Sequence, residues 1–184
     1  MVLHCYDSIV PDAIPPVAVV LGYIDGAWPT YPYLHKKFQK ATTLVVSVTT
    51  GTGVADVLDC ENGNATPDTA AAWAVERLKE GQHPTVYGGR DALDAVILGV
   101  RRRHVQADLV SYFLADWNQV GVLEARLRWP KAIAKPYAAW QFAGNVRVPS
   151  GHTIDASVVT RQWAEMLGWT GNAGRQRRLF RVVP

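Results

Sequence analysis

Two acidic side chains stand two positions apart at the end of an apolar segment. Residues 54–64 read VADVLDCENGN, so Asp59 and Glu61 come just before an Asn-Gly turn signal. Because side chains alternate along a strand, these two carboxyl groups should point the same way, about 7 Å apart, and Leu58 and Cys60 the other way. Repulsion between like charges should raise the pKa of one carboxyl, which leaves an acid beside a carboxylate. Glycoside hydrolysis requires that division of roles.

Two further aspartates lie in segments that also predict strands. Asp7 ends VLHCYD (2–7), and Asp155 lies inside HTIDASVV (152–159). An aspartate inside a strand is disfavoured unless it has a partner or a wet cavity. Taken singly, each acidic residue also fits a solvated strand end or a loop cap, such as an Asx-turn at Asp7 before Pro11. Taken together, the four predict an acidic site at one mouth of a barrel.

Aromatic and amide side chains near the predicted strands suit a sugar ligand, because sugar rings present apolar C–H faces that stack on aromatic rings. For Trp140, which the polar Gln141 follows, sugar stacking and core packing remain open alternatives. Trp73 and Trp163 fall at helical spacing among apolar neighbours and are expected in the core, while Trp28 lies near a strand end. The predicted sugar-binding residues are Tyr23, Tyr87, Trp117, Trp140 and Gln141.

Eight short apolar segments separated by turn residues predict eight strands. They span residues 2–7, 17–25, 42–50, 54–61, 83–89, 108–116, 137–143 and 152–159. Several are nearly continuous in Val, Ile and Leu, which is typical of parallel strands buried on both faces. In parallel α/β barrels the carboxyl ends of the strands form the active site, so the acidic residues are expected at that rim.

Helices are predicted between some of the strands. The clearest has Thr66 as N-cap and Pro67 at its first position, and it stops at Gly81. The other predicted helices lie near residues 90–103, 120–128 and 161–168. A full eightfold barrel typically takes about 250 residues, so a chain of 184 residues predicts an α/β fold of the irregular (β/α) TIM type, compact and with reduced helices.

Charge divides the chain into a near-neutral body and a basic end. Residues 161–184 hold five arginines against one glutamate, a net +4, so the other 160 residues carry −1 of the total +3. We expect a barrel over residues 1–168 and a basic C-terminal arm over 169–184. Nucleic-acid binding needs a positive face on the fold, so the body argues against it, and the arm is expected to meet a protein or an acidic surface.

Other classes of protein lack support in the sequence. No apolar run approaches the ~20 residues of a membrane helix, and the first residues have neither a basic start nor a signal-peptide core. Cys5 and Cys60 form no CxxC pair, so we expect no metal and no cofactor. Both cysteines are interpreted as small buried hydrophobes, with a disulfide only if their strands are adjacent.

The order of these segments resembles the family 25 glycoside hydrolases, the lysozymes that cleave peptidoglycan glycan. It resembles still more closely their divergent glycoside-hydrolase-like relatives in actinobacteria and their phages. The resemblance covers about residues 3–159. It rests on Asp7, the Asp-x-Glu strand, VYGG (86–89), YFLADW (112–117) and WQFAGNVRVPSGHTIDAS (140–157).

The resemblance implies a role for each acidic residue. Glu61 would be the general acid, Asp59 would orient or stabilise the developing charge, and Asp7 and Asp155 would complete an acidic floor. The substrate's own acetamido group would assist, so no protein nucleophile is required. The implied substrate contains muramic acid, as expected for an endolysin-like muramidase.

One alternative follows from the departures from that family, since the basic arm has no counterpart there and no wall-binding repeat follows the barrel. The barrel would then be catalytically weak or inactive, and would serve as a structural or cell-wall-binding component of a phage particle. Its partners would be peptidoglycan and, through residues 170–184, other virion or cell-wall proteins. In either case the protein would reach the cell wall from a phage particle or host cell without a Sec signal.

Overall fold

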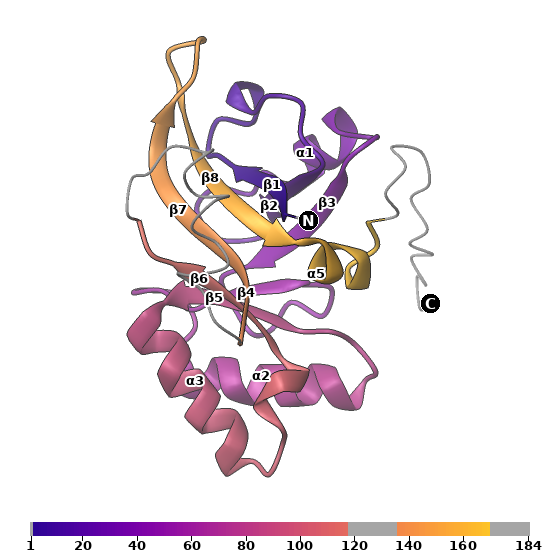
Figure 1. Cartoon of the computed structure of the whole chain (residues 1–184), viewed down its shortest axis with the longest axis vertical. Coiled ribbons are helices and arrows are strands. Elements are labelled where there is room, and N and C mark those ends of the chain that lie inside the picture. Colours follow the sequence, from indigo (N-terminus) through magenta and orange to yellow (C-terminus); the bar gives the residue numbers. More distant parts are fainter. Residues whose placement is uncertain (1, 118–135, 170–184) are drawn as a thin grey trace.

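All eight predicted strands form, and they pair edge to edge in chain order to make a closed barrel (Figure 1). The structure is a computed structural model that describes residues 2–117 and 136–169. The strands are β1 (Val2–Asp7), β2 (Val19–Tyr23), β3 (Thr42–Ser47), β4 (Val57–Asp59), β5 (Thr85–Gly89), β6 (Ser111–Ala115), β7 (Tyr137–Arg147) and β8 (Thr153–Thr160). The prediction of an α/β barrel with reduced helices is confirmed.

The closing strand runs against its neighbours. From β1 to β7 each strand is parallel to the next, whereas β8 is antiparallel to both β7 and β1. The expectation of parallel strands is therefore wrong for β8. Only residues 148–152 separate β7 from β8, too few for a crossover that would bring the chain back parallel. As a result, the beginning of β8 lies at the rim where the other strands end.

Four helices accompany the barrel in the described part of the chain: α1 (Tyr31–Lys37), α2 (Pro67–Lys79), α3 (Arg90–Arg102) and α5 (Arg161–Met166). As predicted, Thr66 caps α2, and its side chain accepts a hydrogen bond of 3.3 Å from the backbone N–H of Thr69. The short helix α1 was not expected. Single 3-10 turns occur at Pro11–Ala13 and Ala107–Leu109. The helix predicted near 120–128 and the arm at 170–184 lie outside the described residues.

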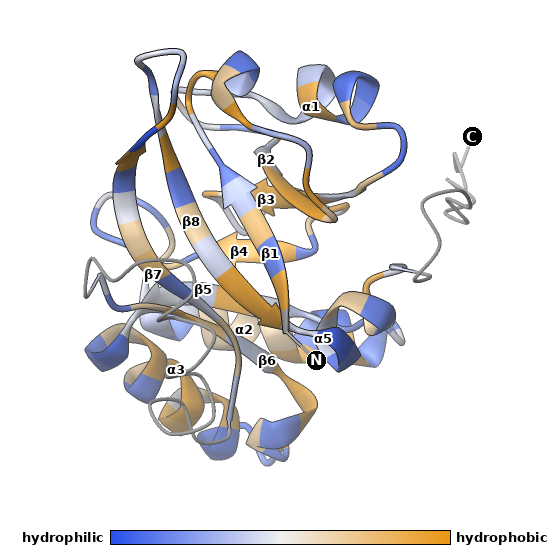
Figure 2. Cartoon of the chain, turned by 45° about the horizontal axis from the view of Figure 1, so that its top comes forward, coloured by the Kyte–Doolittle hydropathy of each residue, from blue (hydrophilic) through white to orange (hydrophobic). Residues whose placement is uncertain are grey.

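Most of the core lies in two layers, one inside the barrel and one between the barrel and the pair α2 and α3, and a smaller third cluster joins Leu34 of α1 to Val20 and Ile154. Val57 faces the interior, whereas Leu58 and Cys60 pack in the outer layer, so the predicted alternation is correct. Figure 2 shows the hydrophobic colour concentrated on β2, β3 and β4 and mixed on α2 and α3. The two helices pack so closely that a Cβ on Gly99 would lie 2.7 Å from the Cβ of Ala71.

Helix α5 closes the end of the barrel where β1 and β5 begin. Trp163 is 1% exposed, and its indole N–H donates a 2.9 Å hydrogen bond to the hydroxyl of Thr85. Its ring meets that of Phe113 edge-on at 5.9 Å. Trp73 is also buried, so both tryptophans lie in the core as predicted. Open access to the barrel interior is therefore left to the opposite end.

Both cysteines are buried and free; Cys5 lies on β1 and Cys60 directly follows β4, and these two strands are not adjacent. None of the helices within residues 2–117 and 136–169 has the length and apolar character needed to span a bilayer. In the same ranges, no group of three or more His, Cys, Asp or Glu side chains is arranged to hold a metal ion.

Candidate active site

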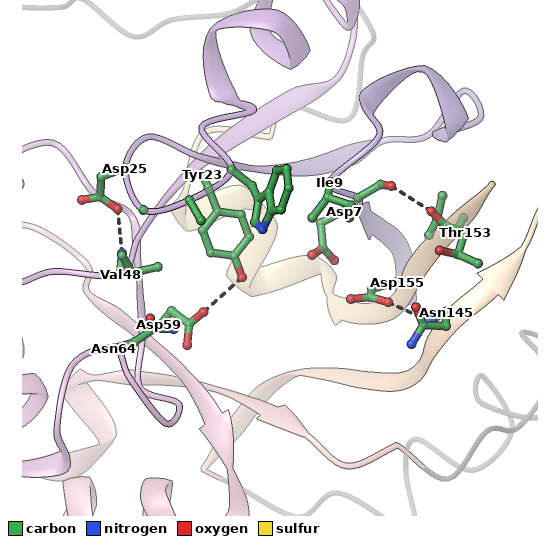
Figure 3. A pocket seen from close by; sticks show the side chains of 15 residues that line it. Asp7, Ile9, Tyr23, Asp25, Val48, Asp59, Asn64, Asn145, Thr153 and Asp155 are labelled. Atoms are coloured by element: carbon green, nitrogen blue, oxygen red, sulfur yellow. Dashed lines mark hydrogen bonds between the residues drawn. The ribbon is translucent and has the colours of Figure 1, made fainter.

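The four predicted carboxyl groups converge at the open end of the barrel. Asp7 and Asp59 are the last residues of β1 and β4, Glu61 follows β4, and Asp155 is near the start of β8. Asp7 and Asp155 are direct partners across the antiparallel pair, which puts their Cβ atoms roughly 5 Å apart. Figure 3 shows Asp7, Asp59 and Asp155 around one space. The reversed direction of β8 is what brings Asp155 to this rim.

A cavity of about 350 Å³ opens between these strands. Its lining includes Asp7, Asp25, Asp59 and Asp155, and none of its described lining residues is Lys, Arg or His. Glu61 does not line this cavity but a neighbouring hollow of about 570 Å³ beside the start of α2. Asn64 lines both hollows, so it stands at the boundary between them.

Asp59 is held from two sides. The hydroxyl of Tyr23 donates a 3.1 Å hydrogen bond to Oδ2 of Asp59 (Figure 3). Burial raises the pKa of Asp59, although hydrogen bonds from Asn64, Tyr23 and the backbone of Glu61 act in the opposite direction. The carboxyl is thus fixed in orientation at the floor of the cavity, as a group that orients or stabilises a reacting centre requires.

Glu61 is coupled to a buried pair of polar side chains. Burial raises the pKa of Glu61, and the nearby Asp59 and Asp155 raise it further, while a hydrogen bond from Tyr87 lowers it. The Tyr87 hydroxyl also donates to Oε1 of Gln141. A hydroxyl has one proton, so Tyr87 donates either to Gln141 or to Glu61 at any moment. A protonated Glu61 would leave the Tyr87–Gln141 hydrogen bond in place.

Asp7 has the most strongly perturbed carboxyl of the group. Burial raises its pKa well above the ordinary value, and Asp155, Asp59 and Glu61 add to the rise. Across the strand pair, Oδ1 of Asp155 accepts a 2.8 Å hydrogen bond from the backbone N–H of Asn145. Asn145 has φ +57° at an irregularity in β7, a conformation that asparagine tolerates better than most residues. This irregularity aims a backbone donor at the site.

Replacing Asp7 with asparagine should stabilise the fold at neutral pH, by about 1 kcal/mol. Asp7 binds its proton more tightly in the folded than in the unfolded state, so its favourable contribution exists at low pH and is lost as pH rises through the raised pKa. Asparagine cannot ionise and should remove this loss. Melting temperatures measured between about pH 5 and about pH 8 should decline less with pH in Asp7→Asn than in wild type.

The exposed Asp94 on α3 provides a matched control, because Asp94→Asn makes the same chemical change away from the mouth. Its melting temperature should follow the wild-type pH dependence. If Asp7→Asn were less stable than wild type at neutral pH, the ionised carboxyl group of Asp7 would not be destabilising the folded protein.

Four of the five predicted sugar-binding residues lie at or near the open end of the barrel. Tyr23 lines the cavity, and Tyr87 and Gln141 are buried among the carboxyl groups. Trp117 is 53% exposed beside β7, where a Cβ on Gly144 would lie 3.7 Å from its ring and 3.5 Å from Oδ1 of Asp155. These four therefore lie at or around the mouth.

Trp140 does not join them. It is 1% exposed, its ring packs against Phe142 at 5.7 Å, and its indole N–H donates a 2.9 Å hydrogen bond to the backbone carbonyl of Asp116. It belongs to the outer core layer, whereas its neighbour Gln141 points into the barrel. Of the two alternatives for Trp140, core packing is the one that the structure bears out.

Several cavity residues were not predicted as site residues, namely Ile9, Asp25, Trp28, Asn64 and Asn145. Trp28 had a usable signal, because it stands in the turn-rich segment DGAWPTYP directly after an apolar strand. A tryptophan in such a loop has no apolar periodicity that would bury it. For Asn145 no signal in the sequence marks the irregularity of β7.

The fold and this rim define a closed α/β barrel with one sealed end and one acidic, open end. A solved structure with a similar fold is the crystal structure of the CTP1L endolysin, with a TM-score of 0.50 and 17% sequence identity. The similarity covers 81% of this chain and 59% of that chain. No protein-family model matches the sequence, and no curated protein matches it. The likeness to the endolysin is one of fold.

Proposed function

We propose that this protein is a glycoside hydrolase that cleaves the glycan of peptidoglycan in the manner of a muramidase. The observation that carries the proposal is the gathering of four carboxyl groups, Asp7, Asp59, Glu61 and Asp155, at one barrel mouth. In the described part of the chain no Lys, Arg or His lines this cavity, and such a carboxyl group cluster suits a neutral, hydroxyl-rich ligand and repels a phosphorylated one. The shared fold with an endolysin supports peptidoglycan as the polymer.

In the proposed reaction Glu61 is the general acid. Burial and the neighbouring Asp59 raise its pKa, which favours the protonated form whose proton passes to the glycosidic oxygen as the bond to the sugar carbon breaks. Glu61 lines the hollow next to the acidic cavity, and two neighbouring hollows suit the two sugars on either side of the bond that is cleaved. Asp59, oriented by Tyr23, stabilises the positive charge that develops on the sugar ring.

The second half of the reaction restores the enzyme. In the family that the sequence resembles, the acetamido oxygen of the substrate attacks the sugar carbon, so the protein supplies no nucleophile. Glu61, now ionised, then takes a proton from the water that opens this intermediate. Asp7 and Asp155 keep the floor of the cavity acidic and bind hydroxyl or amide groups of the sugar.

The test is turnover by the wild-type protein. Purified peptidoglycan from several bacteria is incubated with it, new reducing ends are counted, and the sugar at each new end is identified. Muramic acid at the new ends would support the proposal. Another amino sugar at the new ends would support glycoside hydrolysis, but of a different bond of the glycan. Binding to the walls without any new reducing ends would contradict the proposal and favour an inactive wall-binding barrel.

A further inference from the structure

The rim of the cavity carries two large apolar side chains that the proposed reaction does not use. Trp28, in the loop between β2 and α1, is 60% exposed, and Ile9, between β1 and β2, is 61% exposed. Both line the same cavity as Asp7 and Asp59. Exposed apolar surface beside a polar pocket is unfavourable in water and often marks a place where a ligand binds.

The loop that carries Trp28 is anchored on its first side by Asp25. Its carboxyl accepts hydrogen bonds from the backbone N–H of Val48 at 2.8 Å (Figure 3), from the hydroxyl of Ser47 at 2.5 Å and from that of Thr52 at 2.6 Å. Gly26 follows with φ +80°, and a Cβ there would lie 3.1 Å from Val48. Asp25 therefore holds the loop by hydrogen bonds to residues at and after the end of β3. The loop turns tightly at Gly26 against Val48.

The second side of the loop is fixed as well. The backbone N–H of Tyr23 donates a 3.2 Å hydrogen bond to the hydroxyl of Thr30. The start of α1 lies so close to β2 that a Cβ on Gly22 would be 2.7 Å from the Cα of Tyr31. With both ends of a short loop held, Trp28 is presented at the rim by defined contacts, which lowers the entropy cost of stacking a ligand on it.

The negative charge of the cavity lining restricts the charge of the ligand, and a second exposed tryptophan, Trp117, indicates its length. Among the residues that the structure describes, the cavity lining contains four aspartates and no basic residue, so an anionic sugar would be repelled and an uncharged one accepted. Trp117 and Asp155 both lie close to Gly144 of β7, whereas Trp28 follows β2. Two exposed rings from different sides of the barrel, with carboxyl groups from β1 and β4 between them, suit a ligand longer than a single sugar.

We propose that Trp28 is the stacking surface of a subsite for an uncharged amino-sugar unit, on the β2 side of the carboxyl group cluster. A sugar ring lies with its C–H face on the indole, while its hydroxyl and amide groups face Asp7 and Asp59. The glycan then crosses the mouth towards Trp117. The identity of the polymer rests on the proposed function, whereas the stacking itself is independent of turnover.

Binding of chitohexaose, an uncharged amino-sugar oligomer, tests this subsite. The measurement is made by calorimetry in the Glu61→Gln background, so that no cleavage occurs. Adding Trp28→Ala should weaken binding about tenfold, in line with the energy of an aromatic contact, while Trp28→Phe should retain most of the affinity. Leu98→Ala, which removes an exposed apolar side chain on α3, should leave binding unchanged. An oligogalacturonate, which is anionic, should not bind.

Three results would overturn the subsite: equal binding by Trp28→Ala and its parent, binding of the oligogalacturonate as tight as that of chitohexaose, or no binding of chitohexaose at all. Melting temperatures of the variants show whether a loss of binding reflects loss of the fold. Failure of the proposed function alone would give a different pair of results. Chitohexaose binding would still depend on Trp28, but the wild-type protein would release no reducing ends from peptidoglycan.

Discussion

Replacing Glu61 with glutamine should slow glycan cleavage by about 10²–10⁴-fold, the usual contribution of a general acid. The change keeps the size and hydrogen-bonding shape of the side chain but removes the proton that the leaving oxygen needs. Because burial raises the pKa of Glu61, the wild-type rate should fall as pH rises through that pKa. The residual rate of Glu61→Gln should lack that decline. Reducing ends released from peptidoglycan at several pH values measure both effects.

The exposed Glu76 on α2 offers a matched control, since Glu76→Gln makes the same chemical change far from the mouth. Its rate and pH profile should match those of wild type. If Glu61→Gln kept the wild-type rate, the assignment of Glu61 would be wrong. Asp7, whose pKa burial raises well above the ordinary value, would then be the acid to test next.

Replacing Trp163 with alanine should lower the free energy of unfolding by about 3–5 kcal/mol. The side chain fills the closed end of the barrel, and its removal leaves a cavity that Phe113 and the surrounding strands cannot fill without moving. The hydroxyl of Thr85 also loses its indole partner in a buried position, which adds to the cost. Chemical denaturation monitored by circular dichroism measures the change.

Two other tryptophan variants calibrate this effect. Trp163→Phe keeps most of the buried volume and should cost less than the alanine change. Trp117→Ala removes an exposed tryptophan and should alter stability by no more than about 0.5 kcal/mol. Equal stabilities for Trp163→Ala and Trp117→Ala would mean that α5 contributes little to closing the barrel.

Strand positions could be predicted well because their signal is local. Apolar runs bounded by turn residues locate all eight strands, and the Thr66–Pro67 pair locates the start of α2. Strand direction has no such signal, since an apolar pattern reads the same in a parallel and an antiparallel strand. The predicted strands leave only residues 144–151 for the connection before β8, and the shortness of that connection was an available indication that β8 reverses. Helix α1 was missed because its seven residues include a proline and only one buried side chain, Leu34.

The site could be predicted only as far as residue type and alternation allow. Asp7, Asp59, Glu61 and Asp155 were identified because carboxyl groups at strand ends need a partner or a cavity. The place of Trp140 depends on which face of β7 packs against the rest of the fold, and that is set by tertiary contacts. The sequence marks Trp28 as a loop residue, but it does not tell that this loop reaches the cavity, because that is also set by tertiary contacts.

Because β8 is antiparallel to β1, the first and last described residues lie at the same end of the barrel. Val2 is paired with Thr160, the last residue of β8, and α5 follows at once, so residues 2 and 169 both belong to the sealed side of the molecule. Figure 1 shows β1 beginning near α5. A tether attached at either position would hold the molecule by its base and leave the acidic opening facing outward. Immobilisation on a bead or fusion to a carrier is therefore compatible with access by a polymer as bulky as a cell wall.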